Sequence, residues 1–400
     1  MALPLAGIRV VDVSEYGFVP SCAVALAELG ADVIKVERLD GDAGRGIISS
    51  GMVPTKDGFD YLNEIFNLNK RGIALDITTE EGYAVLSKLV ETADVFVTNQ
   101  LPRVQRRLRT TAEDITAIKP SIVYARGHGQ GQRGPDSEDG GFDAVSYWSR
   151  GGVGHVLSAP DAIEPAAQRP ATGDLPAGTF LMGGICAALV KAARTGEGSI
   201  VDVSLLGSAI WTLGPDVAYA SMTGEQMVLT NGSRSPITRT YRTSDGYFVM
   251  LMMINEDRYW DAATTALGMT DIGAQYADPA KRQAAWSDLA ADFAARIGSL
   301  TRAEVQQRLN ERQCIFSFFN TPVELLTDPA AQANGYIVDH PEYDFLKVAT
   351  APMQFDNEIP KVVRSAPHLG EHTAEILTEI GYDADQVAAL AQEGTVSVRS

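Results

Sequence analysis

The sequence predicts an α/β fold with a second, smaller α+β domain, and three observations support this prediction. Strand-like and helix-like segments alternate through the first 130 residues, which is the pattern of a parallel sheet with right-handed crossovers. The chain has 400 residues, more than one hydrophobic core usually covers. Residues 241–251 place a Ser-Asp-Gly turn between two alternating segments, which predicts an antiparallel hairpin in the second domain.

The elements follow from local patterns of apolar residues, because short runs rich in Val and Ile predict strands and longer amphipathic stretches predict helices. In the larger, Rossmann-like domain the expected strands are residues 8–13, 31–36, 73–77, 93–97, 121–125 and 199–204, and the expected helices are residues 22–29, 79–92, 111–118, 177–194 and 374–380. In the smaller domain the expected helices are residues 257–267 and 284–309.

The domain boundaries follow from these elements. We expect the larger domain to comprise residues 1–204 and 330–400, and the smaller domain residues 225–320, with linkers at 205–224 and 321–329. The first linker has the pattern of a single helix. The glycine-rich, polar segment 127–154 is expected to form loops over a cleft.

The charge and the missing motifs exclude several classes of function. A net charge of −18 argues against a nucleic acid or an anionic membrane as partner, although a local basic pocket would still accept a small polyanion. The odd, widely spaced cysteines predict neither disulfides nor a zinc site; they are Cys22, Cys186 and Cys314. The histidines lack metal-ligand spacing, and dinucleotide, hydrolase and phosphate-loop motifs are missing, so no tightly bound cofactor is expected.

No membrane segment is expected either. The N-terminus lacks the basic region and long apolar core of a signal peptide. The longest uninterrupted apolar run follows Asp174 and is well short of the ~18 residues of a membrane span. These features predict a soluble, cytoplasmic protein.

The most informative segment is residues 169–178, which places Asp174 at the start of a long apolar helix. Gly173 allows a sharp turn, and Pro176 suits the first helical turn, where its missing N–H costs nothing. Unpaired amides and the helix dipole are expected to keep the Asp174 carboxylate ionised. Such a carboxylate is a candidate nucleophile toward an activated acyl group; the alternative is that Asp174 only caps the helix.

Polar and basic residues follow several of the expected strands. Arg38, Asn99 and Arg103 stand at such strand ends, and Lys70 and Arg71 lie in a neighbouring loop. In an open parallel sheet, ligands bind outside the carboxyl ends of the strands. Cations gathered at one crevice of an acidic protein predict a phosphate-bearing ligand. Solvated surface charge is the alternative, above all for the arginines of the helix after residue 103.

Taken together, the motifs resemble those of the class III CoA-transferase family, which includes formyl-CoA transferase, carnitine CoA-transferase and 2-methylacyl-CoA racemases. The resemblance extends over nearly the whole chain. Each motif is weak by itself, but the ordered set is specific. The matching segments are residues 4–12, 29–37, 69–76, 93–99, 127–130, 173–174, 195–198, 201–205, 328–329 and 369–377.

The resemblance implies that Asp174 attacks the thioester carbonyl of a donor acyl-CoA, and that CoA passes to an acceptor carboxylic acid through an aspartyl anhydride and an aspartyl-CoA thioester. Coenzyme A and its esters would then be substrates. The positions that match the family's CoA-binding residues are Arg38, Leu68, Asn69, Lys70, Arg71, Asn99, Gln100 and Arg106. The resemblance also implies a ring-like, interlocked homodimer.

One departure from the family concerns the racemases, in which the histidine of a Gly-His-Asp motif exchanges a proton with the substrate. The matching residues here are Gly141, Phe142 and Asp143, and phenylalanine cannot carry a proton. A transferase is therefore the first hypothesis. A 2-methylacyl-CoA racemase is the second, and a non-catalytic CoA-binding subunit is the third.

A second departure concerns the members that act on oxalate, which carry a glutamine in the first turn and a glycine-run loop in the small domain. This chain has Gly17 in that turn, and residues 223–232 contain no glycine run. A larger or more apolar acyl group is therefore expected. Arg234, Arg239 and Arg242 are candidates to bind a second substrate carboxylate, or else they are surface charges of the hairpin.

Overall fold

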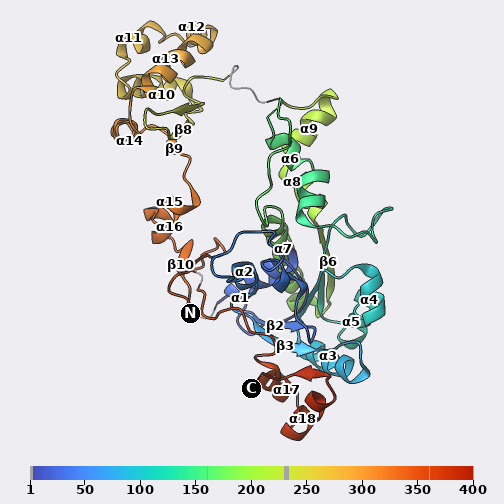
Figure 1. The fold of residues 1–400 in the computed structure, drawn as a ribbon. Coiled ribbons are helices and arrows are strands. Elements are labelled where there is room, and N and C mark those ends of the chain that lie inside the picture. The colour runs from blue at the N-terminus through green and yellow to red at the C-terminus, as the bar shows by residue number, and fades with distance from the viewer. Residues whose placement is uncertain (1–2, 160, 229–233, 360, 400) are drawn as a thin grey trace. The chain divides into compact units, whose positions relative to one another are not determined.

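The computed structural model describes residues 3–159, 161–228, 234–359 and 361–399. The chain divides into a larger unit, Met1–Ser221 with Pro329–Ser400, and a smaller unit, Met222–Asp328. Figure 1 shows the chain coloured from its N-terminus to its C-terminus, so that both segments of the larger unit can be followed. Both segments expected as linkers, 205–224 and 321–329, cross these boundaries. The larger unit thus takes in α8, most of α9 and Pro329.

The larger unit is built on one seven-stranded sheet, in the order β12-β3-β2-β1-β4-β5-β6. All neighbouring strands are parallel except β12, which pairs antiparallel with β3. The predicted α/β class with a mostly parallel sheet is therefore confirmed. The strand order reverses between β1 and β4, and ligands of such sheets bind at this reversal. The strands are β1 Arg9–Val13, β2 Asp32–Glu37, β3 Arg71–Leu75, β4 Val95–Thr98, β5 Val123–His128, β6 Ser199–Ser204 and β12 Val396–Ser397.

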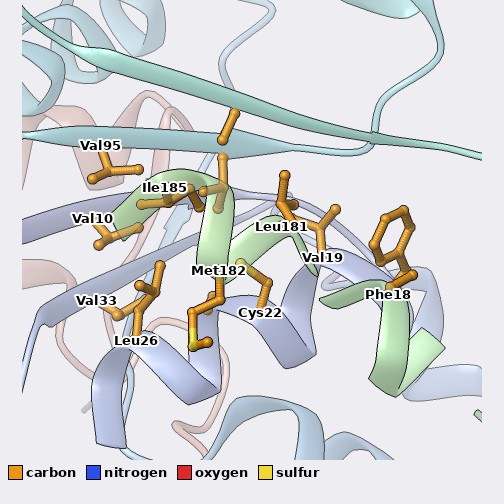
Figure 2. Packing of buried hydrophobic residues seen from close by; sticks show 14 of the residues in the cluster. Val10, Phe18, Val19, Cys22, Leu26, Val33, Val95, Leu181, Met182 and Ile185 are labelled. Atoms are coloured by element: carbon orange, nitrogen blue, oxygen red, sulfur yellow. The ribbon is translucent and has the colours of Figure 1, made fainter. Parts of the chain in front are cut away.

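Helices cover both faces of this sheet, because successive strand residues point to opposite faces. On one face, Val10, Val33, Val95 and Val123 of neighbouring strands pack against α1 (Phe18–Glu28) and α7 (Asp174–Thr195). Figure 2 shows this core, in which Leu26 of α1 and Met182 and Ile185 of α7 meet the strand valines. The opposite face packs against α3 (Glu80–Thr92), α5 (Ala112–Ile118), α17 (Thr373–Glu379) and α18 (Ala384–Gln392).

Shorter elements join these layers. They are α2 Tyr61–Asn67, α4 Pro102–Leu108, α6 Val153–Leu157, α8 Leu205–Thr212, α9 Gly214–Thr223, α16 Pro329–Ala333, the 3-10 turn Ala43–Gly46, the π-helix Ala144–Arg150, and a hairpin of β10 Ile337–Asp339 and β11 Lys347–Ala349. Segment 127–154, expected as loops, contains the π-helix and the start of α6. Segment 205–224, expected as one helix, is two helices that break at Leu213.

The smaller unit contains the predicted hairpin, formed by β7 (Thr240–Arg242) and β8 (Phe248–Leu251). A third strand, β9 (Phe316–Phe318), pairs with β8. Trp260 and Phe293 stack in the core beneath this sheet. The expected helix 284–309 is two helices, and the helices of this unit are α10 Glu256–Ala266, α11 Thr270–Gln275, α12 Pro279–Ala284, α13 Trp286–Gly298, α14 Arg302–Glu311 and α15 Pro322–Leu325.

Helix α7 corrects the sequence-based argument that the apolar run after Asp174 is too short to span a membrane. Its 22 residues contain an 18-residue window with a mean hydropathy of 1.5, so by length and composition it is long and apolar enough to cross a membrane. It is the one such helix among the described residues. The uninterrupted run was the wrong measure, since isolated polar residues do not break an apolar window. One face of α7 packs against α1 and the sheet, and a third of the window is buried.

Candidate active site

Asp174 is the first residue of α7, and its side chain is partly exposed. The N-cap residue before it is Gly173, which has no side chain of its own to cap the helix. The carboxylate of Asp174 lies against Gly17, where a Cβ atom would overlap it. Among the described residues, no donor forms a hydrogen bond with the carboxylate oxygens of Asp174. The alternative that Asp174 only caps its helix therefore has no support in the geometry.

The ionisation of Asp174 differs from the sequence-based expectation. Burial raises the pKa of Asp174 to about 7, and the negative charge of Asp143 adds to the increase. The expected hydrogen bonds from helix amides, which would have favoured the charged form, are absent among the described residues. Asp174 is thus a poorly solvated carboxyl group that loses its proton near neutral pH.

Aromatic and apolar side chains surround the carboxyl group. Tyr16 and Phe142 form an edge-to-face pair with ring centroids 5.2 Å apart, and each is next in sequence to a residue beside Asp174. Phe66 of α2 approaches Gly17. A small hollow lies beside these residues, lined by Tyr16, Asp42, Gly44, Ile47, Leu62, Asn63, Phe66 and Asn67. This surrounding favours an apolar ligand group next to Asp174.

The first turn, between β1 and α1, is held in place at the reversal of the strand order. Asn99, after β4, accepts from the backbone N–H of Glu15 at 3.0 Å and donates to its carbonyl at 2.7 Å. Lys35 is completely buried and joins the Ser14 carbonyl (2.8 Å) to the Asp42 carboxylate (2.7 Å). These contacts fix the turn in which Tyr16 has a φ of +66°, a conformation that costs a non-glycine residue about 1 kcal/mol or more.

Two of the predicted CoA-binding residues present exposed guanidinium groups. Arg38, after β2, lies 3.4 Å from Asp40 and 3.5 Å from Glu15. Arg106, on α4, pairs with Glu138 at 2.8 Å. Exposed ion pairs such as these contribute about 1 kcal/mol or less. A phosphate with two negative charges can therefore replace the carboxylates at small cost.

The segment before β3 is placed differently from its prediction. Lys70 has no exposed surface, and its ammonium group donates to Asp12 (2.8 Å) and to two further oxygens. Burial lowers the pKa of Lys70 to about 8, although Asp12 opposes the shift. Arg71 is the first residue of β3, because that strand begins two residues earlier than expected. It therefore lies at the amino end of the sheet, where it pairs with Asp32 and Glu379.

Three further residues predicted to bind CoA make contacts within the protein. Leu68 is buried against Val24 and Val348. The Asn69 side chain accepts from the backbone N–H of Val363 at 2.8 Å, and so joins the loop after α2 to the C-terminal segment. Gln100 accepts from the Thr110 hydroxyl at 3.0 Å. Contact between these residues and CoA stays a prediction.

The described residues contain no group of three His, Cys, Asp or Glu side chains that could hold a metal ion. His128 lies 3.8 Å from Asp202, on the adjacent strand. Burial would raise the pKa of Asp202, but hydrogen bonds from His128 and Arg126 outweigh burial and lower it to about 2. Asp202 also lines a hollow of about 280 Å³ with Phe180 and Trp211.

Comparison with known proteins identifies the class. The model of CoA-transferase family III matches residues 5–373, and the chain belongs to this family. It is a class III acyl-CoA:carboxylate CoA-transferase, which transfers CoA between an acyl-CoA and a carboxylate.

Individual relatives match over almost their full length. The (R)-2-hydroxy-4-methylpentanoate CoA-transferase of Clostridioides difficile is 30% identical, over 96% of this chain and 97% of its own. The cinnamoyl-CoA:phenyllactate CoA-transferase of Clostridium sporogenes is 28% identical, over 98% and 97%. The crystal structure of a CaiB/BaiF family protein from Brucella suis superposes with a TM-score of 0.81 at 27% identity, over 95% of this chain and 100% of that one.

Sequence reasoning predicted Asp174 but assigned no role to Asp143. The negative charge of Asp143 raises the pKa of Asp174. Asp143 entered only as the neighbour of Phe142 in the altered racemase motif. A signal was available: the N-cap residue Gly173 has no side chain, so the helix needs an acceptor from elsewhere in the chain.

Proposed function

We propose that Asp174 is the nucleophile of this transferase and that CoA is transferred through covalent aspartyl intermediates. The observation that carries this proposal is the exposure and the missing hydrogen bonds of the Asp174 carboxyl group. It is partly exposed, and no hydrogen bond from the described residues engages it. A poorly solvated, unpaired carboxylate is more reactive toward a thioester carbonyl than a solvated one.

The reaction is a sequence of four acyl exchanges. Asp174 attacks the donor thioester, the C–S bond breaks, and an aspartyl anhydride forms with release of CoA thiolate. The thiolate attacks the aspartyl carbonyl, which gives an aspartyl-CoA thioester and the free donor acid. The acceptor carboxylate attacks this thioester, the C–S bond breaks, and a second anhydride forms with release of CoA thiolate. The thiolate then attacks the acyl carbonyl of that anhydride and regenerates Asp174. No step needs net proton transfer, and exclusion of water protects the anhydrides.

The surroundings of Asp174 support an apolar acyl group. Tyr16, Phe66 and Phe142 border the site, and within the described part of the larger unit the charged group that acts on Asp174 is another carboxylate, Asp143. A second carboxylate on the substrate would therefore meet repulsion at this position. Two relatives are named for (R)-2-hydroxy-4-methylpentanoate and for cinnamoyl-CoA with phenyllactate, which agrees with this assignment. Others are named for succinyl-CoA with mesaconate or glutarate, which are dicarboxylic substrates.

Replacement of Asp174 by alanine tests the proposal. We expect the Asp174→Ala variant to lose at least about 10³-fold in turnover, because no nucleophile remains, and to bind CoA as the wild type does. Hydroxylamine should trap an aspartyl hydroxamate at residue 174 in the wild type alone, as detected by mass spectrometry of the peptide.

A matched control is Asp385→Ala, which removes an exposed aspartate from α18 and should leave turnover unchanged. Full activity of Asp174→Ala would refute the nucleophile. Entry of deuterium into the α-carbon of the substrate in heavy water, with no acceptor acid present, would indicate the racemase instead.

We also propose a homodimer and a cytoplasmic location. Helix α9 buries none of its residues within one chain, and large apolar side chains of α7 and α8 are exposed. Such surfaces are typical of subunit interfaces. The described cysteines are unpaired, which is consistent with a reducing compartment.

A further inference from the structure

Asp143 is joined to the start of the catalytic helix by a short hydrogen-bonded connection. It stands directly before the π-helix Ala144–Arg150, and its Oδ1 accepts from the backbone N–H of Gly173 at 3.0 Å. The backbone N–H of Asp174 also favours the charged form of Asp143. Gly173 has no room for a side chain, because a Cβ atom there would overlap both Asp143 and the Tyr147 ring. The contact therefore requires a glycine before Asp174.

This contact replaces the usual capping of a helix. An N-cap side chain normally accepts a hydrogen bond from the first free amides of the helix. Gly173 is the N-cap residue of α7 and has no side chain that could accept one. Asp143 supplies the acceptor from a segment 30 residues earlier. The side chain of Asp174 forms no capping hydrogen bond among the described residues and remains available for reaction.

The second oxygen of Asp143 is not used in the same way. Asp143 is 9% exposed, and its Oδ2 is buried without a hydrogen-bond partner among the described residues. Burial raises the pKa of Asp143, while the amides of Gly173 and Asp174 and the side chain of Gln168 oppose this increase. The negative charge of Asp143 acts on the neighbouring Asp174 carboxylate and raises its pKa.

Within the part of the chain that the structure describes, the other elements packed at this point contribute no opposite charge that lowers the pKa of Asp174. The turn before α1 contributes Gly17 and Tyr16, and burial raises the pKa of Tyr16 above its usual value, so this phenol is neutral near pH 7. Helix α2 contributes Phe66, and the π-helix contributes Tyr147. Asp143 is the charged group that raises the pKa of Asp174.

We propose that Asp143 is a positioning residue that caps α7 in place of Asp174 and whose negative charge makes the Asp174 carboxylate a stronger nucleophile. This rests on the proposed function of Asp174. Two neighbouring carboxylates repel each other in the free enzyme. When Asp174 forms an anhydride or a thioester, it loses its charge and the repulsion disappears. The repulsion therefore favours formation of the covalent intermediate.

The Asp143→Asn variant tests the charge separately from the hydrogen bond, because the asparagine oxygen can still accept from Gly173. Asp174 must be ionised to attack, so kcat/KM of the wild type should rise with pH through about 7. In Asp143→Asn we expect this acid limb to move down by about one pH unit. We also expect kcat at pH 8.5 to fall by about threefold, because nucleophilicity changes by about half a power of ten for each pKa unit, with KM for acyl-CoA unchanged.

Two further measurements keep this test independent of transferase activity. In protein labelled with carboxyl-13C aspartate, the Asp174 resonance is identified by its loss in Asp174→Asn, and its NMR titration should shift downward in Asp143→Asn. The Asp143→Ala variant, which also loses the cap, should melt at a lower temperature than Asp143→Asn. Asp385→Asn, at an exposed site on α18, should match the wild type in every assay.

An unchanged acid limb and unchanged titration in Asp143→Asn would overturn the proposal, as would a change in KM or thermal stability alone. If Asp174→Ala keeps its activity while the Asp174 titration still shifts, the electrostatic coupling stands and the proposed nucleophile fails. These two failures are therefore distinguishable.

Discussion

Individual charged residues serve two different purposes in the larger unit. Lys35 and Lys70 are fully buried and neutralise Asp42 and Asp12 beneath the first turn. Arg38 has a side chain that is 60% exposed, so it can change partners when a ligand arrives. Position in the sheet, and not residue type, decides between support of the fold and contact with a ligand.

This distinction predicts opposite effects for two substitutions. Arg38→Ala should raise KM for acyl-CoA by about tenfold, the loss of one exposed phosphate contact, and leave the melting temperature unchanged. Lys70→Met should lower the free energy of unfolding by about 3 to 5 kcal/mol, because it leaves Asp12 buried without its partner. Steady-state kinetics measures KM, and urea titration measures the free energy of unfolding, for each variant. A stable Lys70→Met protein with a raised KM would show that Lys70 binds CoA directly.

The sequence predicted Asp174 because its segment carries local information: a glycine, an aspartate and a proline at the start of an apolar helix. It did not predict the raised pKa, since that depends on Asp143 and on Gly17, which are distant in sequence. Lys70 was misplaced for the same reason. Nothing adjacent to Lys70 indicates that Asp12, 58 residues away, receives its ammonium group.

At the scale of elements, the sequence pattern predicted those helices and strands whose bounds depend on nearby residues. Strand β6 begins and ends where expected, and α3 begins after its Thr79 cap. Strand β12, only two residues long, was missed because it exists by pairing with β3. The break between α8 and α9 had a readable signal in Gly214 and Pro215, since proline lacks the N–H that a continuous helix needs.

Helix α1 gives a prediction of this kind, because it binds the C-terminal segment through a buried acid. Glu28 is 2% exposed and accepts from the backbone N–H of Ala351 at 2.7 Å. Burial raises the pKa of Glu28 from 4.5 to about 7. The folded state therefore holds this proton more tightly than the unfolded state. Stability from Glu28 is fully present below pH 4.5 and is lost as the pH rises to about 7.

Glu28→Gln removes this dependence, since glutamine has no proton to lose. Between pH 4.5 and pH 8, we expect the free energy of unfolding of the wild type to fall by about 3 kcal/mol relative to that of the variant. Urea unfolding at both pH values measures the difference. Glu91→Gln, at an exposed position of α3, is the control and should follow the wild type. Identical pH dependence of Glu28→Gln and the wild type would show that Glu28 does not hold the proton.

At the scale of the whole molecule, several large apolar side chains of the larger unit are exposed on neighbouring elements, which is typical of a subunit interface. The side chain of Trp211 is 75% exposed and packs edge to face on Phe180, with ring centroids 6.4 Å apart. Val190, Ile200, Ile210 and Val217 are exposed on α7, β6, α8 and α9. The last of these elements, α9, crosses the boundary of the two units after Ser221, and the resemblance to the family implies an interlocked dimer.

The proposed dimer makes Trp211 a test site. Light scattering should give twice the mass of one chain at all accessible concentrations. Trp211→Glu should cost about 2 to 4 kcal/mol of dimer stability, because it places a charge in an apolar interface, and part of the protein should become monomeric and inactive. Trp211→Phe keeps an apolar ring and should remain dimeric. A monomeric, active wild type would exclude the interlocked dimer, and a fully dimeric Trp211→Glu would place the interface elsewhere on the larger unit.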